Sequence, residues 1–186
     1  MEIVVSTTIF ATVLTLMLSL FNFTLKINRR TEALRQTTQG MRTFTEFVVK
    51  EIRNGQIDYS DDINAQCSGN YDTPSGYTTF LGIVNSSGQQ ECFEWSGAET
   101  KQLYLHKIGI ETQTINPANF SVDLVKFYVR PICDPGTLCD GGAYPAIQPF
   151  VSIVMKFTVT LPSGETRTIP YQTTVSTDQY DVPDNN

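Results

Sequence analysis

The residues of this chain best able to do chemistry are its four cysteines and its single histidine. The cysteines, Cys67, Cys92, Cys133 and Cys139, all follow the apolar start of the chain, and no two of them form a CxxC pair. A structural zinc site uses Cys and His ligands at short, regular spacings, so this pattern disfavours zinc. We expect His106 to be an ordinary strand residue and the cysteines to form disulfides.

Four cysteines allow three disulfide connectivities, and the sequence fixes none of them. We favour Cys67 with Cys92 and Cys133 with Cys139, because each pair is the closest along the chain. Loop-closure entropy gives the two bonds about 3.5 and about 2 kcal/mol respectively. Disulfides form in oxidising compartments, so the domain that carries them is expected outside the cytoplasm.

No motif of a known catalytic site accompanies these residues. GxSxG, Walker A and HExxH motifs are missing from the sequence, and one histidine is too few for most His-dependent sites. Carboxylates cluster at Asp58, Asp61 and Asp62, and again at Asp134 and Asp140, but neither run has the spacing of an EF-hand calcium loop. We therefore expect solvated acidic loops, no cofactor or metal, and a protein that is not an enzyme.

The overall charge excludes a further class of function. The chain carries a formal net charge of -6 and has a sequence pI of about 4.7. Non-specific nucleic-acid binding depends on clustered Lys and Arg that release counterions from phosphates. No nucleic-acid partner is therefore expected, and the charge is assigned to solubility.

An apolar segment at the N-terminus dominates the sequence. From Ile3 to Leu25, 23 residues contain no charge, no Pro and no Gly. As a helix they cover roughly 34 Å, enough to cross a hydrocarbon core of about 30 Å. Lys26, Arg29 and Arg30 mark the end of the segment, so residues 1–25 are expected to form a membrane-spanning half.

The same helix is expected to continue as an amphipathic half over residues 26–54. No breaker follows Lys26, and we expect one helix from about Glu2 to Arg53, with Asn54 and Gly55 as its stop signal. Apolar side chains recur at spacings of three, four and seven, which predicts a single buried face. The stripe consists of Leu34, Met41, Phe44, Phe47, Val48 and Ile52, and all but Phe47 are assigned to packing against a folded head.

The remaining sequence, residues 55–177, predicts a β-rich head. Short segments rich in β-branched and aromatic residues are bounded by Gly, Pro, Asn and Ser. The last two are expected to form an antiparallel hairpin, with Pro170 on an edge or bulge. From Thr177 onwards the chain is expected to be exposed, with 178–186 a flexible acidic tail. The predicted strands are 77–84, 92–95, 102–107, 124–130, 150–161 and 166–177.

These elements together predict an α+β fold, in which a long N-terminal helix packs through its second half on an antiparallel sheet. An antiparallel sheet with one apolar face needs a cover. The stripe from Leu34 to Ile52 supplies one. Glu2, at the edge of a long apolar helix, needs either a partner or a place near the membrane surface, because an unpaired carboxylate in lipid costs a few kcal/mol.

The N-terminus, MEIVVSTTIFA, resembles the mature start of type IV pilins and of type II secretion pseudopilins, in which a glutamate precedes a long apolar helix. The step Ile9-Phe10-Ala11 is especially similar to J-type pseudopilins. The resemblance implies a prepilin peptidase that cleaves and methylates the N-terminus, and a glutamate that engages the terminal amine of a neighbouring subunit. By resemblance that role falls to Glu2. The implied assembly residues are Glu2, Ile3, Val4, Val5, Ile9, Phe10, Val13 and Leu14.

The same resemblance implies partners and a location. The partners would be copies of the chain or other pilin-like subunits, together with an assembly platform in the inner membrane. The subunit would wait in the cytoplasmic membrane as a single-pass protein with its head exported, and then join a pilus or a type II secretion-like filament.

One alternative remains open from the sequence. A single-pass anchor that holds an extracellular binding or adhesion domain, and that never polymerises, has the same apolar segment and the same disulfide-bonded head. The positive-inside rule, taken literally, would place Lys26, Arg29 and Arg30 in the cytoplasm with the head. The cysteines favour the opposite orientation.

Overall fold

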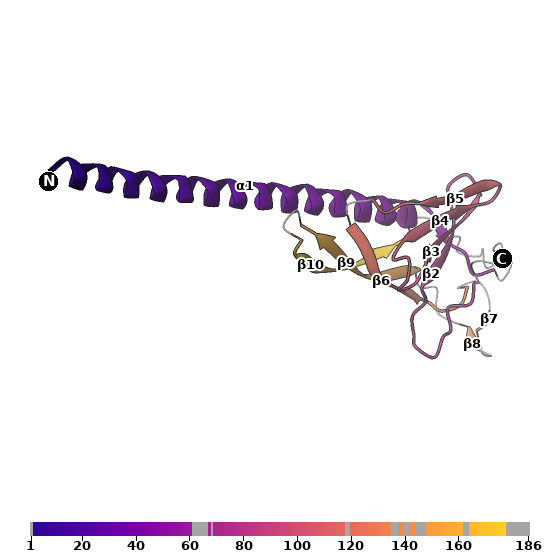
Figure 1. Cartoon of the computed structure of the whole chain (residues 1–186). Helices are drawn as coiled ribbons and strands as arrows, with labels where there is room; N and C mark the ends of the chain where they lie inside the picture. Colours follow the sequence, from indigo (N-terminus) through magenta and orange to yellow (C-terminus); the bar gives the residue numbers. More distant parts are fainter. Residues whose placement is uncertain are drawn as a thin grey trace.

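The computed structural model of the chain consists of one long helix and a β-rich head at its C-terminal half (Figure 1). It describes residues 2–60, 67, 69–117, 120–134, 138–139, 142–143, 148–161 and 164–177, with the backbone alone at 138–139 and 142–143. The predicted α+β class, a long N-terminal helix packed on antiparallel β-structure, is confirmed.

Helix α1 (Glu2–Asn54) is continuous for 53 residues, or about 80 Å. It ends one residue after the predicted last residue, at the Asn54-Gly55 stop signal. A Cβ at Gly55 would lie 3.0 Å from the backbone oxygen of Val84 and 3.2 Å from that of Glu51. Glycine therefore lets the chain leave the helix in close contact with the first strands of the head.

Five strands form the first sheet, in sequential antiparallel order. The predicted tail, residues 178–186, lies outside the described part of the chain. The first sheet begins two residues after the end of α1. Its strands are β1 (Gln56–Ile57), β2 (Phe80–Val84), β3 (Gln90–Trp95), β4 (Leu103–Lys107) and β5 (Ile110–Thr114). Strands β2 and β4 fall within predicted strands, and β3 contains the predicted strand 92–95 and begins two residues before it. The pattern of alternation missed β5, because all five of its residues are exposed and none faces a core.

Three longer strands form the second sheet, in the order β10-β9-β6. They are β6 (Phe120–Arg130), β9 (Phe150–Thr160) and β10 (Thr166–Ser176). Strands β9 and β10 form the predicted hairpin in continuous register from Thr160 with Thr166 to Phe150 with Ser176. Pro170 lies on β10, an edge strand of this sheet, as the sequence predicted for a proline within a strand. A further two-stranded sheet pairs β7 (Leu138–Cys139) with β8 (Gly142–Ala143).

The head thus contains two main sheets where the sequence predicted one. The two sheets are joined by an isolated bridge between Thr78 and Phe127. Its backbone hydrogen bonds run from the Thr78 N–H to the Phe127 oxygen at 2.9 Å and back at 2.8 Å. This bridge brings the start of β2 against the middle of β6, so that both sheets border one apolar core.

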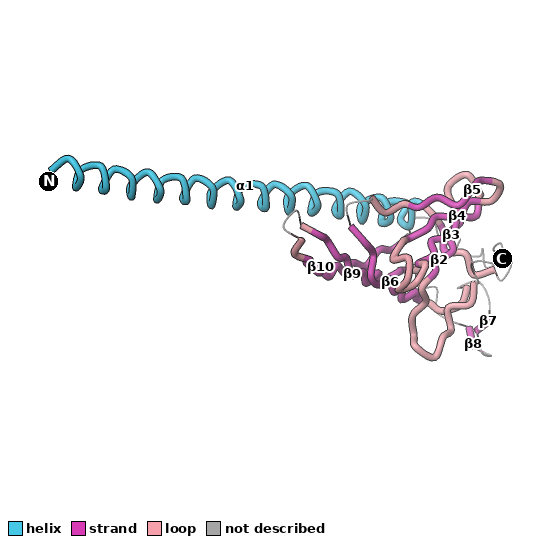
Figure 2. The backbone as a smooth tube through the Cα atoms, in the orientation of Figure 1, coloured by secondary structure: helices cyan, strands magenta, loops and turns pink. Residues whose placement is uncertain are grey.

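The core lies between the second half of α1 and the two sheets (Figure 2). Phe44 is 4% exposed, and its ring meets those of Phe120 and Phe157 edge-on, with centroids 5.7 and 5.9 Å away. Strand β9 contributes its inward side chains at every second position, from Val151 to Val159. The helix is therefore one wall of the head, and the head holds one half of the helix in place.

One prediction for the end of the head is wrong. Thr177, predicted to begin an exposed tail, is fully buried. Its N–H donates to the Pro149 oxygen at 3.2 Å, and its own carbonyl accepts a bond from the Gln148 side chain at 2.7 Å. Thr177, the residue after β10, is therefore still hydrogen-bonded to the segment that precedes β9.

Candidate assembly surface

The first half of α1 carries a large apolar surface that no described part of the chain covers. Every residue from Glu2 to Glu32 is exposed. Ile3 is 80% exposed, Phe10 67% and Val13 44%. α1 is the one helix among the described residues, and it is long and apolar enough to cross a membrane. Apolar side chains exposed on this scale require a lipid or a protein partner.

All eight residues assigned to assembly lie on this exposed half. They are Glu2, Ile3, Val4, Val5, Ile9, Phe10, Val13 and Leu14. Some of them line a shallow groove along one side of the helix, which consists of Glu2, Val5, Ser6, Ile9, Phe10 and Val13. Apart from Ser6, the groove is therefore apolar, and it has a carboxylate at its N-terminal end.

Threonines in the apolar half have their hydroxyl groups bonded to the helix itself. Thr8 donates to the Val4 carbonyl at 2.7 Å, Thr15 to Ala11 at 2.8 Å and Thr24 to Leu20 at 2.9 Å. Thr7 and Thr12 make equivalent bonds. Bonding of this kind satisfies a polar group without water. The sequence analysis treated these residues only as uncharged and did not predict these hydrogen bonds.

Among the described residues, Glu2 is the one charge at the N-terminal end of this surface. It lies in the first turn of α1, where the positive end of the helix dipole favours a carboxylate. The ion pairs found among the described residues do not include it. Glu2 is thus available to a cation from outside the described chain.

A group of charged residues, Arg30, Glu165 and Arg167, lies between the exposed half of α1 and the half that packs on the head. We call this group the polar collar. Arg30 donates to Glu165 at 2.7 Å, and Glu165 also pairs with Arg167 at 2.6 Å. Glu165 follows the tip of the β9–β10 hairpin, where Gly164 has a φ of 80°. Glu165 therefore meets the helix a few residues after the apolar segment ends, at a surface hollow that Lys26 and Arg29 also line.

The second half of α1 brings together the residues assigned to head packing. Met41, Phe44, Val48 and Ile52 are 6% exposed or less, and Leu34 is partly buried against the same core. Phe47, part of the predicted stripe, is 37% exposed instead. It borders an apolar groove with Gln39, Gly40, Thr43, Ile115 and Pro117, among other residues.

Two buried threonines complete this face, and the apolar pattern missed both. Thr37 is 6% exposed and Thr45 is 3% exposed. The Thr37 hydroxyl donates to the Ala33 carbonyl at 2.8 Å, and the Thr45 hydroxyl donates to the Arg42 carbonyl at 3.0 Å. With its hydroxyl bonded to the helix, a threonine presents its methyl group to the core, which explains their position.

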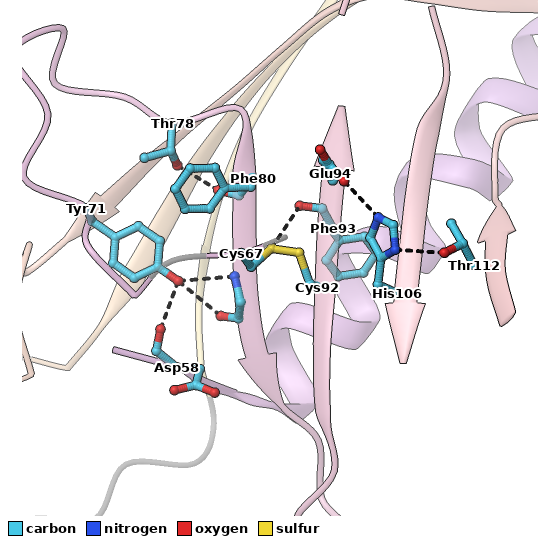
Figure 3. The surroundings of a disulfide bond; sticks show 11 residues. Asp58, Cys67, Tyr71, Thr78, Phe80, Cys92, Phe93, Glu94, His106 and Thr112 are labelled. Carbon is cyan, nitrogen blue, oxygen red and sulfur yellow. Dashed lines mark hydrogen bonds and ion pairs between the residues drawn. A yellow bond between two sulfur atoms is a disulfide. The ribbon is translucent and has the colours of Figure 1, made fainter. Parts of the chain in front are cut away.

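Cys67 and Cys92 form a disulfide that ties a loop to strand β3 (Figure 3). This is one of the two pairs expected from the sequence. The other expected pair is Cys133 with Cys139. The side chain of Cys139 is outside the described part of the chain, so this pair stays a prediction. Both bonded cysteines are buried, at 3% and 2% exposure, so the bond is part of the packed head.

Tyr71 anchors the loop beside this disulfide. Its hydroxyl donates to the Asp58 carbonyl at 2.9 Å and accepts a bond from the Gly82 N–H at 3.1 Å (Figure 3). Burial raises the pKa of Tyr71 well above its usual range, so the phenol keeps its proton. The loop is therefore held to the first sheet both covalently and by hydrogen bonds.

One residue of the acidic clusters, Asp58, differs from the solvated position that was predicted for it. Asp58 is 6% exposed, and its Oδ1 accepts bonds from the Ser60 N–H at 2.9 Å and the Ser60 hydroxyl at 2.6 Å. Asp58 is therefore a buried turn residue. Asp134 is exposed, while Asp61, Asp62 and Asp140 lie outside the described residues.

His106 occupies strand β4, as the sequence predicted. Its ring nitrogens contact Glu94 at 2.8 Å and Thr112 at 2.9 Å (Figure 3). Among the residues that the structure describes, no three His, Cys, Asp or Glu side chains are grouped so as to hold a metal ion. The contacts of His106 are those of a cross-strand hydrogen-bond network.

No protein-family model, curated protein or solved structure matches this chain. What the chain can do follows from its geometry. One continuous helix carries an exposed apolar half, the polar collar, and a half built into a disulfide-bonded head.

Proposed function

We propose that the chain is a pilin-like structural subunit that is anchored in a membrane and assembles into a filament through the first half of α1. The observation that carries the proposal is the continuity of α1. An apolar segment from Ile3 to Leu25, exposed throughout, extends without a break into a half that is buried in the head. A rod of this kind transmits the position of its apolar half directly to the head.

Before assembly, the apolar half lies in the lipid of the cytoplasmic membrane, with the head exported. The length of the segment fits a bilayer core, and the Cys67–Cys92 disulfide requires an oxidising compartment for the head. Lys26, Arg29 and Arg30 then lie at the outer surface of the membrane, together with the β9–β10 hairpin tip that pairs with Arg30.

In the filament, the apolar halves of many copies pack against each other in place of lipid. Lipid tails are as apolar as leucine, so helix association in this setting depends on close packing and on polar contacts. The groove lined by Val5, Ile9 and Val13 accepts side chains of a neighbouring helix. Glu2 then pairs with a neighbour's N-terminal amine, because an unpaired carboxylate in an apolar bundle is costly.

Substitution of Glu2 tests the proposal against a matched control on the same helix. Glu2→Ala should reduce the amount of protein recovered in sedimented filaments several-fold, while the head keeps its disulfide and its folding. Glu46→Ala removes another exposed helix carboxylate, which pairs with Arg42 at 2.9 Å, and should leave assembly unchanged. Equal recovery of the Glu2 variant and the wild type would refute the role of Glu2.

The same preparation distinguishes the subunit from an anchored binding domain. A filament subunit sediments as long polymers after mild shearing of cells that express its assembly partners. An anchored binding domain stays in the membrane fraction as separate copies under the same conditions, and that outcome would refute the proposed function.

A further inference from the structure

A buried glutamate of the first sheet takes part in none of the features described so far. Glu91 on β3 is 1% exposed. It lies in a row of directly paired residues that crosses four strands, Ile57, Ile83, Glu91 and Lys107. Its neighbour Ile83 is fully buried. A carboxylate in such a row is costly to bury unless its oxygens are well bonded, yet Oε2 of Glu91 is buried without a hydrogen-bond partner.

The other oxygen of Glu91 binds two nitrogen atoms at once. The Lys107 ammonium lies 2.8 Å from Oε1, and the Asn85 side-chain amide nitrogen lies 2.7 Å from the same atom. Lys107 is directly opposite Glu91 on β4, and Asn85 follows the last residue of β2. An amine and a carboxamide are therefore held side by side by one carboxylate oxygen.

The carbonyl of the Asn85 side chain is held as well. Its Oδ1 accepts hydrogen bonds from the Ser87 N–H at 2.9 Å and from the Gln89 N–H at 3.0 Å. Paired backbone N–H groups of this kind polarise a carbonyl and stabilise the negative charge that develops on its oxygen during attack by a nucleophile. The turn between β2 and β3 thus supplies an oxyanion hole for the Asn85 carboxamide.

We propose that Lys107 and Asn85 become joined by an intramolecular isopeptide bond, with Glu91 as the catalytic residue. Glu91 takes a proton from the Lys107 ammonium, and the neutral amine attacks Cγ of Asn85. The C–N bond to Nδ2 then breaks. Glu91 passes protons from the attacking nitrogen to the leaving one.

The reaction is balanced without a further reactant. Lys107 loses two of its three ammonium protons, Asn85 loses its amide NH₂, and these leave together as one ammonium ion. One amide bond replaces another, so nothing is oxidised or reduced, and Glu91 returns to its starting state. Holding the reacting groups together makes such a step effectively unimolecular, and a positioned carboxylate supplies the general acid–base catalysis.

The bond would strengthen the same strand that carries the disulfide. Cys92 follows Glu91 on β3, and because neighbouring side chains of a strand point to opposite faces, the two cross-links would lie on opposite sides of the first sheet. The isopeptide would tie the β2–β3 turn to the end of β4. This proposal does not depend on the role of α1 in assembly.

The mass of the intact chain tests the proposal. The full-length protein, purified in detergent and fully reduced, should be lighter than its sequence by one ammonia. Protease digestion should then release a branched peptide in which Lys107 is linked to Asn85. The Lys107→Arg and Glu91→Gln variants should show the full sequence mass. Lys101→Arg, which alters a lysine paired with Asp123 at 2.9 Å, should keep the loss.

Two results would overturn the proposal. A wild-type chain at its full sequence mass, after long incubation of the folded protein, would show that Glu91 and Lys107 form an ion pair and nothing more. An ammonia loss that persists in Lys107→Arg would show that it arises from another reaction, such as cyclisation of an asparagine onto its own backbone. The branched peptide is read directly from the wild type, so a variant that fails to fold does not affect the result.

Discussion

The two halves of α1 differ in what surrounds them, although they form one uninterrupted helix. In the half before Lys26 all described side chains are exposed, most are apolar, and the only charge among them is that of Glu2. In the half after it, one face is buried in the head, including Met41, Phe44, Val48 and Ile52, while the other face remains polar. A helix that is apolar on all sides needs an apolar environment on all sides, whereas a one-faced helix needs only a single partner surface.

The head is folded around the second half of α1 only. The core of the head includes no residue of the apolar half. Stability of the head and behaviour in a membrane or filament are therefore separable properties of the same chain. Changes in the second half should act on the first property, and changes in the apolar half on the second.

The largest expected effect comes from removing one aromatic ring from the head-bound half. Phe44→Ala should lower the free energy of unfolding of the head by about 3–5 kcal/mol, because a buried ring and its contacts with Phe120 and Phe157 are lost. Phe10→Ala, at an exposed position of the other half, should leave it unchanged. Denaturant titration in detergent, followed by Trp95 fluorescence, measures both. Equal losses would show that the halves are not separable.

Loss of the disulfide should have the next largest effect. The bond joins residues separated by 25 positions, so the double variant Cys67→Ser, Cys92→Ser should lose about 3.5 kcal/mol of unfolding free energy through a less restricted unfolded state. Membrane association should not change, since the bond lies in the head. Thermal unfolding and membrane flotation of the same preparation provide the two readouts. A loss of flotation would contradict the separation of the halves.

Acid should weaken the head through Asp123. Burial alone would raise the pKa of Asp123, but hydrogen bonds from Thr158, Lys101 and Ser121 and the charge of Lys101 hold it below its ordinary value of 3.8. A carboxyl whose pKa is lowered by folding stabilises the protein above its unfolded-state pKa, and this contribution is lost as the pH falls through the folded-state pKa.

Asp123→Asn measures that contribution. The variant should be less stable than the wild type at neutral pH, and the difference should shrink as the pH falls below 3.8. Urea unfolding over a series of pH values gives the comparison. A difference that stays constant into acid would mean that the effect of the substitution is not due to the charge. Insertion of the apolar half of α1 into a membrane should not change when Asp123 is protonated, because Asp123 lies in the head.

The smallest expected effect lies at the boundary between the halves. The Arg30–Glu165 pair is substantially exposed, with side chains 45% and 39% accessible. Glu165→Gln should therefore cost no more than about 1 kcal/mol, and added salt should reduce the cost further. Unfolding titrations at low and high ionic strength measure it. A large, salt-insensitive loss would mean that the hairpin tip supports the head more than its exposure indicates.

Periodicity made the helix and the longer strands predictable. The apolar run and the spacing of Leu34, Met41, Phe44 and Ile52 indicated one continuous helix, and the alternation from Val151 to Leu161 indicated β9. Both patterns come from burial of a regular face. Strand β5 has no buried face, so its sequence carried no such signal, and it is held by pairing with β4.

Tertiary contacts account for what the sequence did not show. The burial of Asp58 depends on Ser60 and on the loop at Tyr71, and that of Thr177 on Pro149 and Gln148. Both residues are polar, so composition placed them in solvent. Asn85, Glu91 and Lys107 likewise come together only through strand register. The exposed apolar half, in contrast, could be read from composition alone.

Electron cryomicroscopy of filaments assembled from the chain and its partners tests the central claim most directly. We expect the segment from Ile3 to Leu25 to be surrounded by the same segment of other copies, with no lipid between them, and each helix to continue unbroken into its own head. Apolar segments that lie singly in lipid, with heads that make no regular array, would contradict it.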